Sequence, residues 1–222
     1  MVLFLSGGGS GEKSKEIDIA FVQVVGKDKP ILYIPLARDP PYDACLDWIL
    51  DNFAPFNFNN IKMILSVDNL KRIDLRNYSG IYIGGGDTYR LLKDLIDAKF
   101  LKILADFVNS GGHVYGGSAG AIIFGKSIET SSEKNKVFLR STNGLNMIGQ
   151  NSIFCHYTDE DNERIETYIK KNKTPAIAIP ENAGIIVEDN TIKTIGPRNV
   201  FLFDGSEKNG ITPGNPYKLQ HP

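Results

Sequence analysis

One serine lies in a sequence context that can activate a hydroxyl for nucleophilic attack. Ser118 is part of the run Gly-Gly-Ser-Ala-Gly-Ala over residues 116–121, which matches the Gly-x-Ser-x-Gly pattern of a nucleophile elbow. The elbow is a tight turn between a strand and a helix, so the residues two positions to either side must be minimal. Residues 113–115 have the pattern of a strand, and residues 119–124 can begin a helix. Ser118 is therefore the candidate nucleophile, with the N–H of Ala119 as a candidate oxyanion donor.

A serine nucleophile needs a base within hydrogen-bond reach, and the chain has only three histidines. His221 is next to the C-terminus, and His113 is in the strand that enters the elbow, where its side chain would lie in or across the sheet. His156 follows the apolar residues 152–155 and precedes an acidic segment, so we expect it at the carboxyl end of a strand, on the same edge as Ser118. Elimination makes His156 the candidate base.

Two carboxylates could orient that base. Glu181 stands between two apolar segments, where a charged residue is unusual unless it has a specific role. We therefore favour Glu181 as the third catalytic residue. Glu133, in the polar loop 130–134, is the alternative. The order Ser118, His156, Glu181 differs from the order Ser, acid, His of α/β-hydrolases, which Glu133 would restore.

Three glycine-rich turns, at residues 6–11, 84–88 and 116–118, each follow a predicted strand, and ligands bind at such strand ends in α/β sheets. The first turn resembles a phosphate-binding loop, but Glu12 interrupts the Gly-Lys-Ser run that such a loop requires. Glu12 also stands where the dinucleotide-binding pattern Gly-x-Gly-x-x-Gly requires its third glycine. This favours a turn that brings the backbone close to the site over a nucleotide site. In the second turn, Asp87 or the following threonine can cap a helix, and the glycine N–H groups can hold a developing negative charge.

Short apolar segments alternate with amphipathic ones over most of the chain. This pattern predicts a doubly wound α/β fold with a mainly parallel sheet and helices on both faces. The expected strands are residues 2–5, 31–34, 61–65, 81–83 and 113–115, and the expected helices are residues 13–25, 42–52, 88–97, 100–110 and 159–171. Residues 175–180, 183–187, 191–195 and 200–203 predict antiparallel strands at one edge of the sheet, and the proline-containing tail from Gly210 predicts coil.

Composition excludes several classes of partner. The 222 residues are 41% hydrophobic and 23% charged with a net charge of -1, so neither a nucleic acid nor a membrane is an expected partner. The two cysteines have no metal-ligand spacing, and we expect no cofactor and no metal. The N-terminal apolar run is too short for a signal peptide, which predicts a cytoplasmic protein. We expect one domain over residues 1–222.

Together, these motifs resemble the peptidase E (aspartyl dipeptidase) and cyanophycinase family of serine peptidases. Amidotransferases of related fold would carry cysteine at position 118. The motifs that carry the resemblance are Ser-Gly-Gly-Gly at 6–9, Tyr-Ile-Gly-Gly-Gly-Asp-Thr at 82–88, Gly-Ser-Ala-Gly-Ala at 117–121, His-Tyr at 156–157 and Pro-Glu at 180–181.

The resemblance implies a class I glutamine-amidotransferase-like fold and attack of Ser118 on a peptide carbonyl, with His156 as base. It also implies an oxyanion hole formed by the N–H groups of Ala119 and of a glycine in the 84–86 loop, for which we choose Gly85. Gly84, Gly86 and Asp87 are then candidate substrate-binding residues. The family carries acids near both Glu133 and Glu181, so the resemblance leaves the third residue open.

The chain departs from the family at one point. Relatives that cleave after an N-terminal aspartate place a basic residue downstream of the histidine, whereas residues 159–161 here are Asp-Glu-Asp and the first basic residue is Arg164. Arg164 is a candidate substrate-binding residue, but an acidic rim would favour a basic or free-amine group on the substrate.

The sequence thus predicts a serine peptidase that hydrolyses short peptides, like a dipeptidase, through an acyl-enzyme. An esterase or amidase of small molecules using the same elbow, and a noncatalytic small-ligand-binding domain, are the alternatives. The sequence leaves the oligomeric state, monomer or homodimer, open.

Overall fold

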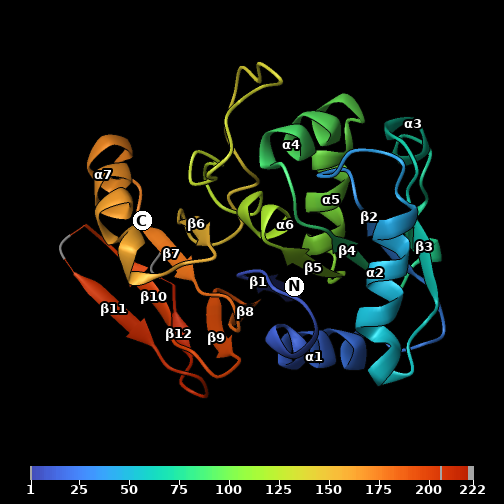
Figure 1. The fold of residues 1–222 in the computed structure, drawn as a ribbon, viewed down its shortest axis with the longest axis horizontal. Helices are drawn as coiled ribbons and strands as arrows, with labels where there is room; N and C mark the ends of the chain where they lie inside the picture. Colours follow the sequence, from blue (N-terminus) through green and yellow to red (C-terminus); the bar gives the residue numbers. More distant parts are fainter. Residues whose placement is uncertain (1, 206, 220–222) are drawn as a thin grey trace.

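An eight-stranded sheet forms the centre of the computed structural model, which describes residues 2–205 and 207–219 (Figure 1). Its strand order is β12-β9-β8-β1-β5-β4-β2-β3. The five strands from β1 to β3 in this order run parallel, and β8, β9 and β12 extend the sheet in antiparallel pairing. The strands are β1 (Val2–Ser6), β2 (Ile31–Ile34), β3 (Ile61–Met63), β4 (Gly80–Ile83), β5 (His113–Gly117), β8 (Gly184–Glu188), β9 (Thr191–Ile195) and β12 (Tyr217–Lys218).

Helices cover both faces of this sheet, as predicted. Side chains alternate along a strand, so Leu3 and Leu5 of β1 enter one core, with the helices α4 and α5, while Phe4 enters the other, with α1 and α2. Figure 1 shows α1 and α5 on opposite sides of the strands. The helices are α1 (Lys15–Val25), α2 (Asp43–Phe53), α3 (Val67–Leu70), α4 (Thr88–Asp97), α5 (Phe100–Asn109), α6 (Ala119–Ile122) and α7 (Asn162–Asn172), with short 3₁₀ turns η1 (Gly11–Lys13), η2 (Ala54–Phe56), η3 (Leu75–Asn77) and η4 (Asp159–Asp161).

A second, four-stranded sheet corrects the prediction that the C-terminal strands all join one edge. Its order is β11-β10-β7-β6, where only β6 and β7 are parallel, and α7 packs on it through a separate apolar cluster. Its strands are β6 (Ser152–Cys155), β7 (Ala176–Ile179), β10 (Val200–Phe203) and β11 (Lys208–Ile211). The split was not predictable from alternation alone, because a hydrophobic pattern identifies a strand but not its neighbour.

Other boundaries differ locally from the prediction. The tail from Gly210 is not all coil, since β11 ends at Ile211 and β12 pairs with β9. The expected helix 13–25 begins instead as η1, closed by the N–H of Ser14 on the carbonyl of Gly11, before α1 starts. The expected helix 159–171 likewise begins as η4, where the Asp161 carboxylate accepts from the N–H of Thr158. Among the described residues, no helix has the length and apolarity to cross a membrane.

Candidate active site

Ser118 lies on a sharp turn between β5 and α6, at the carboxyl end of β5. Its φ of 50° and ψ of -109° are rare for a residue with a side chain, and strain of this kind concentrates at functional sites. The flanking glycines are required by close backbone approach. A Cβ on Gly116 would lie 2.3 Å from the carbonyl oxygen of Gly120, and a Cβ on Gly120 would lie 2.2 Å from that of Ile83. The tight turn that exposes the Ser118 side chain is therefore possible because Gly116 and Gly120 have no side chains.

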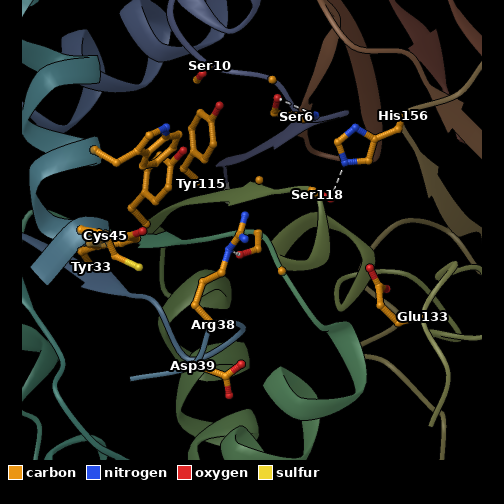
Figure 2. Close-up of a pocket in the computed structure, with 18 of the residues that line it drawn as sticks. Ser6, Ser10, Tyr33, Arg38, Asp39, Cys45, Tyr115, Ser118, Glu133 and His156 are labelled. Carbon is orange, nitrogen blue, oxygen red and sulfur yellow. Dashed lines mark hydrogen bonds between the residues drawn. The ribbon is translucent and has the colours of Figure 1, made fainter. Parts of the chain in front are cut away.

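The two sheets bring His156 and Glu181 to this serine. His156 follows β6 and Glu181 follows β7, and these parallel strands pair with Cys155 beside Ile179, so both residues emerge on the same edge. Ser118 Oγ lies 2.8 Å from His156 Nε2, and His156 Nδ1 lies 2.9 Å from Glu181 Oε1. Figure 2 shows the imidazole directed at Ser118. The three side chains form one hydrogen-bonded chain.

The ionisation of Glu181 determines the direction of these hydrogen bonds. Hydrogen bonds from Lys13 first and from His156 second lower the pKa of the Glu181 carboxyl below its usual range. An ionised carboxylate only accepts, so Nδ1 of His156 carries a proton, and in the neutral imidazole Nε2 then has its lone pair toward the Ser118 hydroxyl. This is the protonation state that a general base for a serine needs.

Glu133, the alternative acid, lies elsewhere in the site. Its carboxylate accepts a hydrogen bond from Ser131 Oγ, and no hydrogen bond joins it to His156 in the part of the chain that the structure describes. Glu133 lines the cavity beside Ser118, on the side away from β1 and β2 (Figure 2).

The first glycine-rich loop passes close to the site, as expected from the sequence, but its contact with His156 and the pairing of Lys13 with Glu181 were not expected. The N–H of His156 donates to the carbonyl of Gly7 at 2.9 Å, and Lys13 Nζ lies 2.6 Å from Glu181 Oε2. Gly8 lies against the imidazole, where a Cβ would come within 2.2 Å of Cε1. The only sequence signal was the glycine run with a following lysine, which resembles a phosphate-binding loop but serves here to hold His156 and Glu181.

A buried polar network holds this loop in turn. The N–H of Gly11 donates to Asn52 Oδ1 at 2.7 Å, and Asn52 Nδ2 donates to Asp18 Oδ2 at 2.7 Å. Ser14 Oγ donates to the same Asp18 oxygen, also at 2.7 Å. Desolvation by burial raises the pKa of Asp18 to about 6, against hydrogen bonds that lower it. The loop is thus tied to α1 and α2 through one carboxylate.

Two backbone N–H groups near Ser118 are candidate donors to a tetrahedral oxyanion. Gly85 lies beside the nucleophile, since a Cβ built on it would lie 3.2 Å from Ser118 Cβ and 3.8 Å from Ser118 Oγ. The N–H of Ser118 is occupied by the carbonyl of Ser6 at 3.1 Å. Within residues 2–205 and 207–219, the N–H groups of Gly85 and Ala119 have no hydrogen-bond acceptor. These are the two donors chosen from the sequence.

A cavity of about 860 Å³ opens beside Ser118. Its wall away from the histidine is aromatic, with Tyr33, Trp48, Tyr82 and Tyr115, and its polar lining includes Arg38 and Glu133. In the glycine-rich turn at residues 84–88, Gly85 and Gly86 line the cavity, whereas Gly84 packs on Tyr33. Asp87 is the N-cap of α4, where its carboxylate accepts a hydrogen bond from the N–H of Arg90 at 3.0 Å.

Arg164 and the acidic segment do not line this cavity. The Arg164 guanidinium donates to the carbonyl of Thr130 and lies 5.1 Å from the centre of the Phe154 ring. Asp159 pairs with Lys208 at 2.6 Å, and Asp161 caps its own turn. The structure therefore places the expected acidic rim and the expected substrate-binding arginine outside the pocket that contains Ser118.

The remaining candidates from the sequence are easily placed. His113 begins β5, at the opposite end of the strand from Ser118, and burial lowers the pKa of its imidazole. His221 is outside the described residues. Both cysteines are free, and Cys155 lies under the elbow, where burial raises the pKa of its thiol. The described residues contain no group of three or more His, Cys, Asp and Glu side chains that could hold a metal ion.

Comparison with known proteins gives consistent matches. The model of the family described as Peptidase family S51 matches residues 2–195. Peptidase E of Shewanella denitrificans is 27% identical over 202 residues, which cover 86% of this chain and 85% of that protein. A Drosophila melanogaster protein named "Probable alpha-aspartyl dipeptidase" is 28% identical over 187 residues, covering 79% and 76%. The crystal structure of a peptidase from an acI-B1 Actinobacterium has the same fold, with a TM-score of 0.70 at 19% identity over 98% of this chain and 96% of that one.

Proposed function

Since the chain belongs to peptidase family S51, we propose that it hydrolyses short peptides, in the manner of a dipeptidase, through an acyl-enzyme on Ser118. The family match confirms the resemblance that the motifs predict, and the chain is a peptidase hydrolase. The observation that carries the mechanism is the hydrogen-bonded chain from Ser118 through His156 to Glu181.

The reaction begins when His156 Nε2 removes the hydroxyl proton as Ser118 Oγ attacks the peptide carbonyl carbon. The carbonyl oxygen becomes an oxyanion, which the N–H groups of Gly85 and Ala119 stabilise. The carbon–nitrogen bond then breaks, and the imidazolium returns its proton to the leaving amine. Water, deprotonated by the same imidazole, attacks the ester and releases the second product. Glu181 holds the imidazole in one tautomer and stabilises its cation throughout.

The size of the cavity supports a short substrate. About 860 Å³ is within the range of sites that enclose small ligands, and it has room for a peptide of a few residues but not for a folded protein. The name of the Drosophila melanogaster relative, which contains the word dipeptidase, agrees with a short substrate.

A fluorophosphonate probe, which reacts with activated serines, tests the proposal directly. We expect labelling of the wild-type chain, no labelling of Ser118→Ala, and release of free amino acids from a dipeptide library by the wild type only. Absence of labelling in the folded wild type would overturn the acyl-enzyme mechanism. Labelling with turnover of esters but of no peptide would instead indicate an esterase using the same elbow.

A further inference from the structure

Arg38 places a positive charge on the cavity wall, on the side opposite His156. Its exposed side chain, in the loop after β2, extends toward the space between Tyr115 and Ser118 (Figure 2). Its Nε donates to the carbonyl oxygen of Gly85 at 3.0 Å, which anchors the guanidinium beside the proposed oxyanion loop. The position of this cation is therefore defined relative to the nucleophile.

The other nitrogens of the Arg38 guanidinium are open to a ligand. Among the described residues, Arg38 forms no ion pair, and its terminal amino groups donate to no protein acceptor. The adjacent carboxylate, Asp39, also lines the cavity, but it pairs with Arg90 rather than with Arg38. A guanidinium with one nitrogen anchored and the outer pair of N–H groups open has the geometry that binds a carboxylate through two parallel hydrogen bonds.

The charges around Ser118 favour one direction of binding. Glu133 is also exposed on the cavity wall, on the other side of Ser118 from Arg38 in Figure 2. A peptide whose scissile carbonyl lies over Ser118 would meet repulsion if it placed a carboxylate near Glu133, and attraction if it placed one near Arg38. The aromatic wall next to Arg38 provides apolar area for the rest of the same residue.

We propose that Arg38 is the specificity residue of this site and binds a carboxylate of the peptide substrate. This inference rests on the proposed peptidase function and assigns its substrate class. The carboxylate can come from an acidic side chain or from the free C-terminus, because the guanidinium recognises the same group in both. Arg38 then fulfils the role for which the sequence suggested Arg164.

Three peptides separate the two sources of the carboxylate. Asp-Leu and Asn-Leu differ only in the side-chain carboxylate, and Asn-Leu and its C-terminal amide differ only in the terminal one. In wild type, kcat/KM should favour the acid over the amide in at least one pair. Arg38→Met should lower kcat/KM for the favoured acid by about 10- to 100-fold, the usual effect of removing a charged hydrogen-bond partner, and change the matched amide far less. Arg38→Lys should restore part of the preference, since it keeps the charge but loses the two-pronged geometry.

Two other arginines complete the experiment. Arg76→Met is the matched control, because Arg76 is 90% exposed, pairs with Asp74 and lies outside the cavity lining. Arg164→Met tests the competing assignment. The proposal is overturned if wild type shows no acid preference, if Arg38→Met lowers all three substrates equally through the Gly85 carbonyl, or if Arg164→Met alone removes the preference.

Binding measurements keep this proposal separable from the proposed function. The same peptides are titrated by calorimetry against Ser118→Ala and against the Ser118→Ala, Arg38→Met double variant. A tighter Kd for the acid that disappears in the double variant supports the carboxylate site even if the wild type hydrolyses none of the peptides, in which case only the peptidase function fails. Equal binding of acid and amide by Ser118→Ala overturns the carboxylate site.

Discussion

Replacing Gly8 with alanine would test whether the first glycine-rich loop positions His156, the proposed catalytic base. A Cβ at this position would lie 2.2 Å from His156 Cε1 and 2.8 Å from both ring nitrogens. Ordinary carbon–carbon contact begins at about 3.5 Å, so the loop and the ring must separate by more than about 1 Å. The loop is tied to His156 through the carbonyl of Gly7, so the simplest relief is rotation of the imidazole away from Ser118.

The size of the effect follows from this displacement. The Ser118–His156 hydrogen bond of 2.8 Å cannot survive a ring movement of that size. A misplacement of about 1 Å in a catalytic group costs about 100-fold in rate, so kcat/KM of Gly8→Ala should fall by at least about 100-fold. The φ of 111° at Gly8 adds backbone strain of about 1–3 kcal/mol for alanine, which should lower the free energy of unfolding.

Gly11→Ala is the matched control for this strain. Gly11 is in the same loop with a φ of 60°, but a Cβ there would meet no described atom within 4 Å. We expect Gly11→Ala to lose about 1–2 kcal/mol of stability and to keep the wild-type kcat/KM. The measurements are peptide hydrolysis, the rate of fluorophosphonate labelling, and chemical unfolding of both variants. If folded Gly8→Ala turns over peptide as fast as Gly11→Ala, the loop does not position His156.

Three further predictions follow from the same contacts. Glu181→Gln should lower kcat by about 10²- to 10⁴-fold, because an amide can hold the wrong tautomer of His156, whereas Glu133→Gln should stay near wild type in steady-state kinetics on a neutral ester. Lys13→Met removes the hydrogen bond that contributes most to the low pKa of Glu181. Because the carboxylate is then no longer shared with an ammonium, it stabilises the imidazolium of His156 more strongly, and the acid limb of the plot of kcat/KM against pH should move to higher pH. Asp18 has a pKa raised from 3.8 to about 6, so its contribution to stability is complete below pH 3.8 and declines as the pH rises through about 6, by about 3 kcal/mol in total.

Each of these predictions has a control. A loss of activity in Glu133→Gln with retention in Glu181→Gln would contradict the assignment of the acid. Lys13→Arg should keep the wild-type pH profile, and an equal shift in Lys13→Arg and Lys13→Met would exclude a role for the ion pair with Glu181. For Asp18, urea unfolding at several pH values is compared with Asp18→Asn, whose stability should lack this decline. If the free energy of unfolding changes with pH in the same way in both proteins, Asp18 has the same pKa in the folded and unfolded states.

The elements around Ser118 were predictable because their signals are local. Strand β5, the Gly-x-Ser-x-Gly turn and the short helix α6 all lie within residues 113–122, and a run of such small residues between a strand and a helix is typical of a nucleophile elbow. The carboxyl ends of β6 and β7 were also predictable from apolar runs that stop before a polar residue. The class I glutamine-amidotransferase-like fold, the single domain and the cytoplasmic location remain predictions.

The contacts that complete the site were not predictable, because they join distant positions. Lys13 and Glu181 are 168 residues apart, and nothing in either local sequence indicates that they meet. Asp18 is in a helix with ordinary amphipathic spacing, and although Ser14 at the start of that helix is local, its second hydrogen-bond donor, Asn52, comes from another helix 34 residues away. Arg38 looks like any single surface arginine until the fold places it on the cavity wall.

These contacts also give the residues of a phosphate-binding pattern a different set of partners in this chain. A glycine-rich loop after the first strand of a parallel sheet points its backbone at the edge where ligands bind, and its conformational freedom suits any close approach. In this chain Gly7 and Gly8 face an imidazole, and the lysine that would meet a phosphate meets Glu181 instead. The carboxylate takes the place of the anion that such a loop would otherwise bind, so the same loop geometry holds the proposed base, His156. Exchanging Glu181 for a neutral residue should therefore remove the charged partner of both His156 and Lys13, whereas Gly8→Ala should displace only the His156 ring.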